Sequence, residues 1–488
     1  MRRLNFALIA KTLCGLLFFE AAFMLVPLVV ALCSGEAGAA RAFAIGLGVT
    51  LGCALGGFYL IRPARTEMSK YDSVLLTALV WIVFSFFGLI PYMLAPTTHL
   101  DFSAAFFEAM SGFTTTGASL VESTDQLSHA IHIWRCLSQW IGGLGIILFT
   151  LALVPMLNSA GGMQMFSAEQ NRIGQEKIGA RISTTSRRIW GVYILLTLGL
   201  FGLLCLGPMS VFEAACHSLS TMSTGGFSTS SDGVNAFPSV YVKIILTLFM
   251  FLGGVNFAMV YRAATGQASA VIHNEAFLTY CRAIGLATAL FIAGILYQGA
   301  YTGWESVTID PLFQVVSFLT STGFILAPFD HWGITVMAMA LILIFIGGCA
   351  GSTSGGAKID RVVYLFKFLK NEIQRTMRPR AVLPVRVSNR VISASQVNEV
   401  VAFLCLYIIL ALAGAIALSL CQIPIEQAFV ASLSAMGNNS LSIADTTLGV
   451  DYLAMTPVAR YVLASLMLIG RLEIFTVIVL FTRNFWRR

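Results

Sequence analysis

Four short segments of this sequence combine hydroxyl side chains with glycine in a pattern that suits the binding of a cation. Each begins with a serine and reaches, six residues later, a position that holds glycine in three copies and serine in the fourth. Glycine adopts positive φ at little cost, so successive carbonyls can turn toward one axis and replace the hydration shell of an ion. We call these segments loop 1 (111–119, SGFTTTGAS), loop 2 (220–228, STMSTGGFS), loop 3 (317–325, SFLTSTGFI) and loop 4 (434–442, SAMGNNSLS).

The candidate ion ligands are three consecutive residues in each loop, ending at the shared glycine register. Their hydroxyl groups can brace a strained backbone or add oxygen ligands beside the carbonyls. A polar loop has no place in hydrocarbon unless it is buried in protein or lines a water-filled path, so a pore between the four loops is the leading interpretation. The predicted ion-binding residues are Thr115, Thr116, Gly117, Thr224, Gly225, Gly226, Ser321, Thr322, Gly323, Asn438, Asn439 and Ser440.

A glycine- and serine-rich segment, residues 347–358 (GGCAGSTSGGAK), is a candidate gate. Glycine at this density disfavours a helix, and unwound backbone at membrane depth must line a cavity. Arg471 lies in an apolar helix, where a charge is expensive and usually functional. The alternative is a structural ion pair, with Glu473 and nearby backbone carbonyls as the possible partners. A phosphate-binding loop is disfavoured because the GK[ST] sequence is missing. The predicted gate residues are Gly347, Gly348, Gly351, Ser352, Gly355, Gly356 and Arg471.

The elements that must position these residues form four units, each an outer helix, a half-helix, a loop and an inner helix. The outer helices are predicted at 72–95, 188–207, 277–299 and 397–421. The half-helices, too short to cross a bilayer, are predicted at 102–113, 210–222, 309–320 and 424–436. Glu108 and Glu213 are interpreted as charges at half-helix starts rather than ion ligands. The inner helices, each with a repeated apolar–glycine motif, are predicted at 128–157, 238–262, 332–368 and 456–483.

The composition predicts an all-α polytopic membrane protein. Hydrophobic residues make up 57% of the chain and charged residues only 11%, against roughly 25% charged residues in soluble proteins. Two N-terminal helices, about 4–33 and 41–61, precede the four units, which surround one central pore. The predicted division is 1–65 for the N-terminal helices, followed by pore repeats at 66–160, 161–265, 266–385 and 386–488.

The net charge of +7 is distributed as expected for membrane orientation, not for nucleic-acid binding. Basic residues concentrate in alternate loops, which places those loops and both termini in the cytoplasm. The remaining loops are acidic, face outward and would attract cations. The basic stretch 358–390 follows the candidate gate and is the predicted docking surface for a partner. None of the ten cysteines forms a C-x-x-C pair, so no disulfide framework or metal site is indicated.

Taken together, the motifs closely resemble the potassium-uptake transporters of the Trk/Ktr/HKT superfamily, nearest to the TrkH branch of bacterial Trk membrane subunits. The resemblance implies K⁺ uptake across the bacterial inner membrane, K⁺ at the predicted ion-binding residues and no organic cofactor. It also implies a homodimer with one pore per subunit and a cytoplasmic nucleotide-binding regulatory subunit of the TrkA type. Residues 347–356 match the family's intramembrane gating loop. The carrying motifs are TTTGAS (114–119), TGGFS (224–228), TSTGF (320–324), GGCAGSTSGGAK (347–358) and GRLEIFT (470–476).

Ser440 departs from the family pattern, which has glycine at this register. A serine held at positive φ costs about 1–2 kcal/mol, so either loop 4 is strained or its geometry differs. This leaves a sodium-permeable or weakly selective cation transporter of the same fold as an alternative function. An enzyme is disfavoured because no nucleophile–base set is found, and a transporter with two inverted halves because the four units repeat in one orientation. Proton symport and passive flux are both compatible with the pattern.

Overall fold

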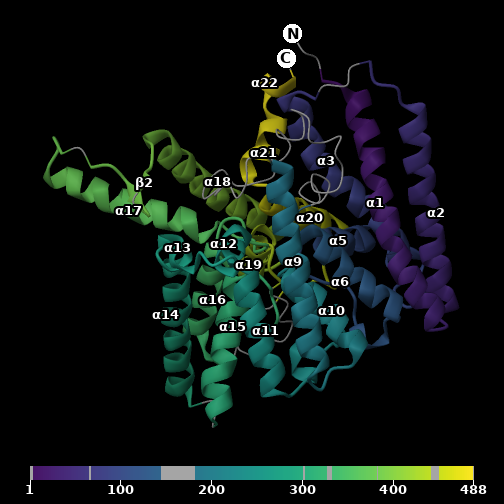
Figure 1. The fold of residues 1–488 in the computed structure, drawn as a ribbon, viewed down its shortest axis with the longest axis horizontal. Coiled ribbons are helices and arrows are strands. Elements are labelled where there is room, and N and C mark those ends of the chain that lie inside the picture. Colours follow the sequence, from purple (N-terminus) through teal and green to yellow (C-terminus); the bar gives the residue numbers. More distant parts are fainter. Residues whose placement is uncertain are drawn as a thin grey trace.

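The computed structural model describes residues 4–64, 68–143, 145, 182–299, 303–326, 332–381, 383–388, 390–440 and 450–486. Two long N-terminal helices, α1 (Phe6–Cys33) and α2 (Ala37–Leu60), pack against each other along one side of the molecule (Figure 1). The side chain of Asn5 caps α1 by accepting a hydrogen bond from the backbone N–H of Leu8 at 3.1 Å. Both helices lie where the sequence predicted them.

Four outer helices complete the set of long apolar helices. They are α3 (Lys70–Gly88) with its continuation α4 (Ile90–Leu94), α9 (Ile182–Cys205), α14 (Glu275–Gln298) and α18 (Ala394–Ser419). Within the described residues, six helical stretches are long and apolar enough to cross a membrane, and they are α1, α2 and these four. The prediction of an all-α polytopic membrane protein is therefore confirmed.

Each outer helix is followed by a half-helix. The half-helices are α5 (Phe102–Phe113), α10 (Val211–Met222), α15 (Asp310–Leu319) and α19 (Ile425–Gly437), of 12, 12, 10 and 13 residues. At 1.5 Å per residue each reaches only about 15–20 Å, less than the ~30 Å hydrocarbon core. Their starts are fixed locally, for example by the capping box in which Ser210 and Glu213 exchange hydrogen bonds. Each ends at its loop, as the sequence predicted.

The inner helices differ from the prediction, because they are broken rather than continuous. In the second repeat, α11 (Val240–Gly253) and α12 (Phe257–Ala264) meet at a bend of 107°. In the fourth, α20 (Pro457–Arg471) is followed by α21 (Ile474–Ile478), with a bend of 118°. In the third, α16 (Ile334–Ile346) and α17 (Ile359–Met377) are separated by the glycine-rich segment. In the first, α6 (His129–Gly143) is described, and the rest of the predicted 128–157 lies outside the described residues, except for Gly145.

The breaks fall at the repeated apolar–glycine motif because the half-helices press against it. A Cβ added to Gly142 would lie 1.8 Å from the carbonyl oxygen of Phe113, at the end of α5. A Cβ on Gly470 would lie 2.2 Å from the carbonyl oxygen of Met436 in α19. No real Cβ approaches an oxygen so closely, so these positions require glycine.

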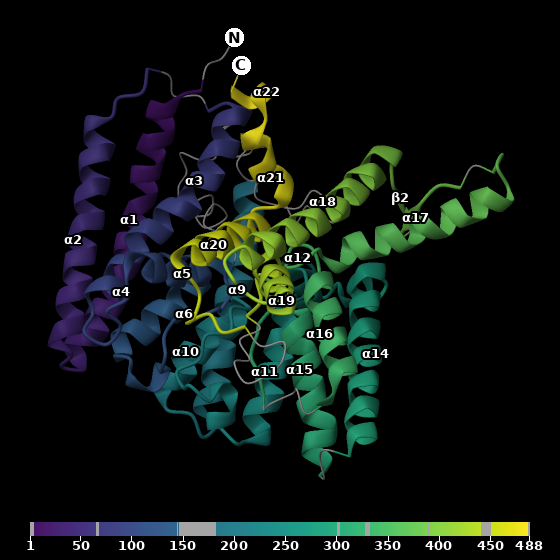
Figure 2. The ribbon, with the colours of Figure 1, turned by 180° about the vertical axis from the view of Figure 1, so that it is seen from behind.

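One part of the fold extends away from the bundle. In both views α17 projects outward, and a short hairpin of β1 (Arg386–Val387) and β2 (Arg390–Val391) leads back to α18 (Figures 1 and 2). The remaining short elements are η1 (Thr124–Gln126), η3 (Gly233–Ala236), α13 (Ala268–Ile272), the π-helical turn η4 (Glu305–Ile309), η6 (Val479–Phe481) and α22 (Arg483–Trp486). The division of the chain at 65, 160, 265 and 385 stays a prediction.

Candidate ion pathway

The four loops share one backbone conformation immediately after each half-helix. The residue two positions before the glycine register has positive φ in every repeat, although it is never glycine. The values are 58° at Thr115, 54° at Thr224, 55° at Ser321 and 48° at Asn438. Positive φ is uncommon and strained for such residues. Its recurrence at four equivalent positions indicates that the repeat specifies this backbone shape.

The glycine register shows where loop 4 differs from the other three. Gly117, Gly226 and Gly323 have φ of 80°, 83° and 80°. Ser440 is not among the positive-φ residues of the described chain. Of the two possibilities raised by the sequence, loop 4 therefore has a different geometry and is not strained at this residue. Leu441 and Ser442 lie outside the described residues.

The loops contact one another in a closed ring. A Cβ added to Gly117 would lie 2.1 Å from the carbonyl oxygen of Gly225, which joins loop 1 to loop 2. A Cβ on Gly226 would lie 2.0 Å from the carbonyl oxygen of Thr322 in loop 3. The hydroxyl of Ser440 closes the ring, because it lies 2.9 Å from a Cβ on Gly323 and 3.3 Å from one on Gly117. The predicted ion-binding residues are thus brought together.

Two asparagines of loop 4 strengthen its contacts with its neighbours. The amide of Asn438 donates to the hydroxyl of Thr116 in loop 1 at 3.2 Å. The amide of Asn439 donates to the carbonyl of Phe318, at the end of α15, at 3.2 Å. Both asparagine side chains are fully buried. Loop 4 is therefore tied to both adjacent repeats through side chains that the other loops do not have.

The hydroxyl groups of the loops mainly brace the backbone. The hydroxyls of Thr114 and Thr116 share a hydrogen bond of 2.9 Å. In loop 3 the equivalent pair, Thr320 and Thr322, shares one of 2.7 Å. The hydroxyl of Thr224 donates to the carbonyl of Ser223 at 2.7 Å. These hydroxyls therefore hydrogen-bond within their own loops, and their role as ion ligands stays a prediction.

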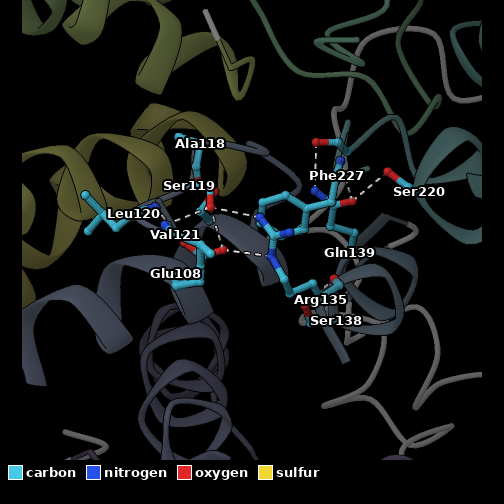
Figure 3. Close-up of polar contacts among 12 residues, drawn as sticks. Glu108, Ala118, Ser119, Leu120, Val121, Arg135, Ser138, Gln139, Ser220 and Phe227 are labelled. Carbon is cyan, nitrogen blue, oxygen red and sulfur yellow. Dashed lines mark hydrogen bonds and ion pairs between the residues drawn. The ribbon is translucent and has the colours of Figure 1, made fainter. Parts of the chain in front are cut away.

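A buried ion pair supports loop 1 from behind, and the sequence analysis missed it (Figure 3). Arg135 of α6 donates to Glu108 of α5 at 2.9 Å and to Ser119 of loop 1 at 2.8 Å, and the backbone N–H of Leu120 donates to Glu108 at 2.9 Å. The interpretation of Glu108 as a charge at the start of a helix is wrong, because its carboxylate binds residues beyond the C-terminal end of α5. The same interpretation fits Glu213, which forms the capping box of α10.

Two glutamines anchor loops 2 and 3, and they too were missed. Gln139 of α6 donates to the carbonyl of Gly225 at 2.7 Å and accepts from the hydroxyl of Ser220 at 2.9 Å (Figure 3). Gln314 of α15 donates to the carbonyl of Phe324 at 3.2 Å and accepts from the N–H of Leu326 at 3.0 Å. Glutamines at positions that are buried in the helices were the available signal, since a buried amide needs partners.

The segments that follow loops 1 and 2 meet at Asp125. Its carboxylate accepts a hydrogen bond from the backbone N–H of Ser231 at 3.1 Å. Hydrogen bonding from Ser231 lowers the pKa of Asp125 below its usual value. This carboxylate therefore stays charged at neutral pH, and the outward orientation of the acidic loops stays a prediction.

The glycine-rich segment is unwound, as predicted, and it packs against the break in the second repeat. The N–H of Cys349 donates to the carbonyl of Gly254 at 2.9 Å. The side chain of Asn256 donates to the carbonyl of Ala350 at 2.7 Å, and the N–H of Phe257 to that of Gly351 at 3.1 Å. Three predicted gate residues have positive φ, at Gly347 (72°), Gly351 (80°) and Gly356 (77°).

The same segment contacts the ends of the half-helices and loop 3. The N–H of Gly355 donates to the hydroxyl of Ser321 at 2.5 Å. The hydroxyl of Thr353 donates to the carbonyl of Met222, at the end of α10, at 3.2 Å. Gly348 and Ser352 belong to the same turn, since the N–H of Gly348 donates to Ser354 at 3.1 Å and Ser352 shares a 2.9 Å hydrogen bond with it. The segment therefore lies directly against the ring of loops.

Arg471 links three repeats beneath the loops. Its guanidinium donates to the carbonyl of Thr353 at 2.8 Å, and to those of Gly142 and Gly143 at 2.7 and 2.5 Å. Of the two kinds of partner named from the sequence, Arg471 binds backbone carbonyls, whereas Glu473 pairs with Arg361. Arg471 thus crosslinks the glycine-rich segment to the first inner helix.

Comparison with known proteins identifies the family. The model of the TrkH family, described as a cation transport protein, matches residues 43–279 and 304–488. The Trk system potassium uptake proteins TrkH of Salmonella typhimurium and Escherichia coli K12 are each 32% identical, covering 99% of this chain and 100% of the relative. The crystal structure of the potassium transporter TrkH from Vibrio parahaemolyticus covers 99% of this chain and 100% of its own, with a TM-score of 0.89 and 29% identity. These relatives confirm a transporter, not an enzyme. The chain belongs to the TrkH family of cation transport proteins.

Proposed function

We propose that this protein takes up K⁺ across the bacterial inner membrane through a channel-like pore between the four loops. The closed ring of loop contacts is the observation that carries the proposal, because a pore requires all four loops to meet around one axis. The half-helices support it, since each ends at the ring and directs the negative end of its dipole there. The family and the potassium-uptake names of its relatives support K⁺ as the transported ion.

The twelve loop residues named from the sequence are our proposed K⁺ ligands. Backbone carbonyls supply most of the oxygen atoms, as expected for a filter that replaces the hydration shell. Loop 4 offers a further acceptor beside Gly323 of loop 3, because Oδ1 of Asn439 is buried without a hydrogen-bond partner among the described residues. A buried acceptor without a donor is unfavourable, and a bound cation would satisfy it.

In the same proposal, residues 347–358 and Arg471 form the gate. The segment would obstruct the pore below the ring, and the charge of Arg471 would oppose a passing cation. A cytoplasmic nucleotide-binding subunit of the TrkA type would control its opening, and the protein would act as a homodimer with one pore per subunit. Both termini would face the cytoplasm, in agreement with the distribution of basic residues.

Flux through liposomes containing the purified protein tests this function. With a membrane potential and no proton gradient, we expect K⁺ and Rb⁺ to enter much faster than Na⁺ and Li⁺. A dependence on an imposed proton gradient would indicate a coupled carrier instead. The proposal is refuted if K⁺ flux does not exceed that of empty liposomes in either of two cases: the unmodified protein with the regulatory subunit added, and the Arg471→Ala variant.

A weakly selective, sodium-permeable transporter is the second candidate function, and the backbone at Ser440 favours it. Loop 4 lacks the positive φ of the other three at this register, so its backbone there departs from the geometry that the other loops share. Under this alternative, Ser440→Gly raises the ratio of K⁺ to Na⁺ flux. The exposed Ser465→Ala of α20 is the control and leaves that ratio unchanged. A high ratio in the unmodified protein that Ser440→Gly does not alter rules the alternative out.

A further inference from the structure

The ion pair between Arg361 and Glu473 joins the projecting helix α17 to the break in the fourth inner helix. Arg361 lies in the first turn of α17, directly after the glycine-rich segment, and is only 4% exposed. Its guanidinium donates to the carboxylate of Glu473 and, at 3.1 Å, to the carbonyl of Ala357 within the segment. One side chain therefore contacts both the segment and the fourth repeat.

Glu473 occupies a constrained backbone position. It lies between α20 and α21, where the chain bends by 118°, and has φ of 63°. A non-glycine residue adopts such a conformation only when its surroundings hold it there. Two residues earlier, Arg471 contacts Thr353 and the first inner helix. A single short turn thus presents Arg471 to the glycine-rich segment and Glu473 to α17.

The surroundings of Arg361 make the loss of its ion pair with Glu473 unfavourable. The guanidinium lies 3.6 Å from the ring centre of Phe403 in α18, close enough for a cation–π contact. A buried charge that loses its partner is strongly unfavourable. The first turn of α17 should therefore keep its position relative to Glu473 as long as the pair is intact.

The placement of α17 suits it to transmit a movement from its projecting end to its first turn. The helix is continuous over 19 residues and its outer part projects from the bundle (Figures 1 and 2). About two turns beyond Arg361, Lys367 forms an ion pair with Glu275 at the start of α14. This contact lies between the projecting end of the helix and its first turn. Rotation of the helix about it would move the first turn when the projecting end moves.

We propose that Arg361 and Glu473 are positioning residues for Arg471, and that their pair transmits movement of α17 to the gate. This rests on the proposed function, in which the glycine-rich segment and Arg471 close the pore. Because α17 is covalently continuous with the segment and paired with the turn that carries Arg471, its movement shifts both parts of the gate together. Control by a cytoplasmic partner then requires only that the partner move α17.

The test measures basal K⁺ flux in liposomes, without the regulatory subunit, for the unmodified protein and for variants of the ion pair. Glu473→Gln should raise it about tenfold, within the range typical of coupling between sites, while leaving the ratio of K⁺ to Na⁺ flux unchanged. In an Arg471→Ala background, Glu473→Gln should add nothing, because both changes act through the same residue. Glu372→Gln is the matched control, since it removes the exposed ion pair with Arg375 on the same helix. It should leave flux unaltered.

A second measurement covers the case in which Glu473→Gln does not insert. In the double variant Arg361→Cys with Glu473→Cys, a short bis-methanethiosulfonate reagent should join the two thiols through disulfides, with release of sulfinate, and lower the flux. A thiol reductant, which cleaves those disulfides, should restore it. The single Arg361→Cys variant with the same reagent is the control. If the unmodified protein carries K⁺ but the effects of Glu473→Gln and Arg471→Ala are additive, this proposal is overturned and the pore stands. The same holds if the unmodified protein carries K⁺ and crosslinking has no effect on the flux. Absence of that flux, even in Arg471→Ala, would overturn the proposed function itself.

Discussion

Two glycines of the loops face carbonyl oxygens that cannot move aside. In Gly117→Ala and Gly226→Ala, the new methyl group would meet the carbonyl oxygen of the next loop at 2.1 and 2.0 Å. In Gly323→Ala it would meet first the hydroxyl of Ser440, at 2.9 Å. A side chain can rotate away but the backbone of a closed ring cannot, although positive φ strains all three variants.

We therefore predict that Gly117→Ala and Gly226→Ala abolish Rb⁺ uptake or its discrimination against Na⁺, and that Gly323→Ala has the weaker effect. Tracer uptake in cells that lack other potassium systems measures this, with membrane insertion checked by immunoblot. Normal uptake and discrimination in the first two variants would show that the ring does not line the pore.

The part of the site that the sequence predicted is the part encoded locally. The need for glycine at 117 follows from a turn of a few residues, so the pattern of loop 1 displays it. The partner of Glu108 is Arg135, 27 residues away, and Gln139 acts on Gly225, 86 residues away. Such contacts are decided by packing between repeats, and no local pattern in the sequence displays them.

At the scale of elements, the breaks in the inner helices are set by contacts with the half-helices. The sequence predicted continuous helices because the apolar runs continue through the glycine motifs. Only the third break was expected, since its glycine content alone disfavours a helix. At Gly470 the approach of α19 decides the outcome, and that approach depends on the assembled bundle.

Gly470→Ala tests the role of this approach. The added methyl group would lie 2.2 Å from the carbonyl oxygen of Met436, so we predict a loss of about 1–3 kcal/mol of stability, typical of overpacking. The control is Gly202→Ala inside α9, where an added Cβ meets nothing within 4 Å; it should gain about 0.5–1 kcal/mol. Thermal unfolding in detergent compares the two, and equal melting temperatures would contradict the packing argument.

At the scale of the whole molecule, the basic face of α17 remains the predicted docking surface for the regulatory subunit. The sequence analysis placed it in residues 358–390, and the basic residues of this stretch that we select for the test are Lys367, Lys370, Arg375 and Arg378. In the structure Lys367 pairs with Glu275 and Arg375 with Glu372, so charge reversal at either would also disturb α17 itself. Lys370 and Arg378 are exposed and better suited to the test.

We predict that Lys370→Glu combined with Arg378→Glu weakens binding of the regulatory subunit, by about 1 kcal/mol per charge or less for exposed contacts. A pull-down at physiological salt measures this, because such contacts are screened. Lys370→Arg keeps the charge and should bind normally. Unchanged binding of the doubly reversed variant would place the docking surface elsewhere.

The ring of loops also has a genetic consequence. All four quarters come from one polypeptide, so one codon change alters one position of the ring and leaves the other three as they were. In a ring of four identical subunits, the same change would appear four times at once. Selection can therefore adjust this ring in single steps, and serine at position 440, where the other three repeats have Gly117, Gly226 and Gly323, is a difference of that kind.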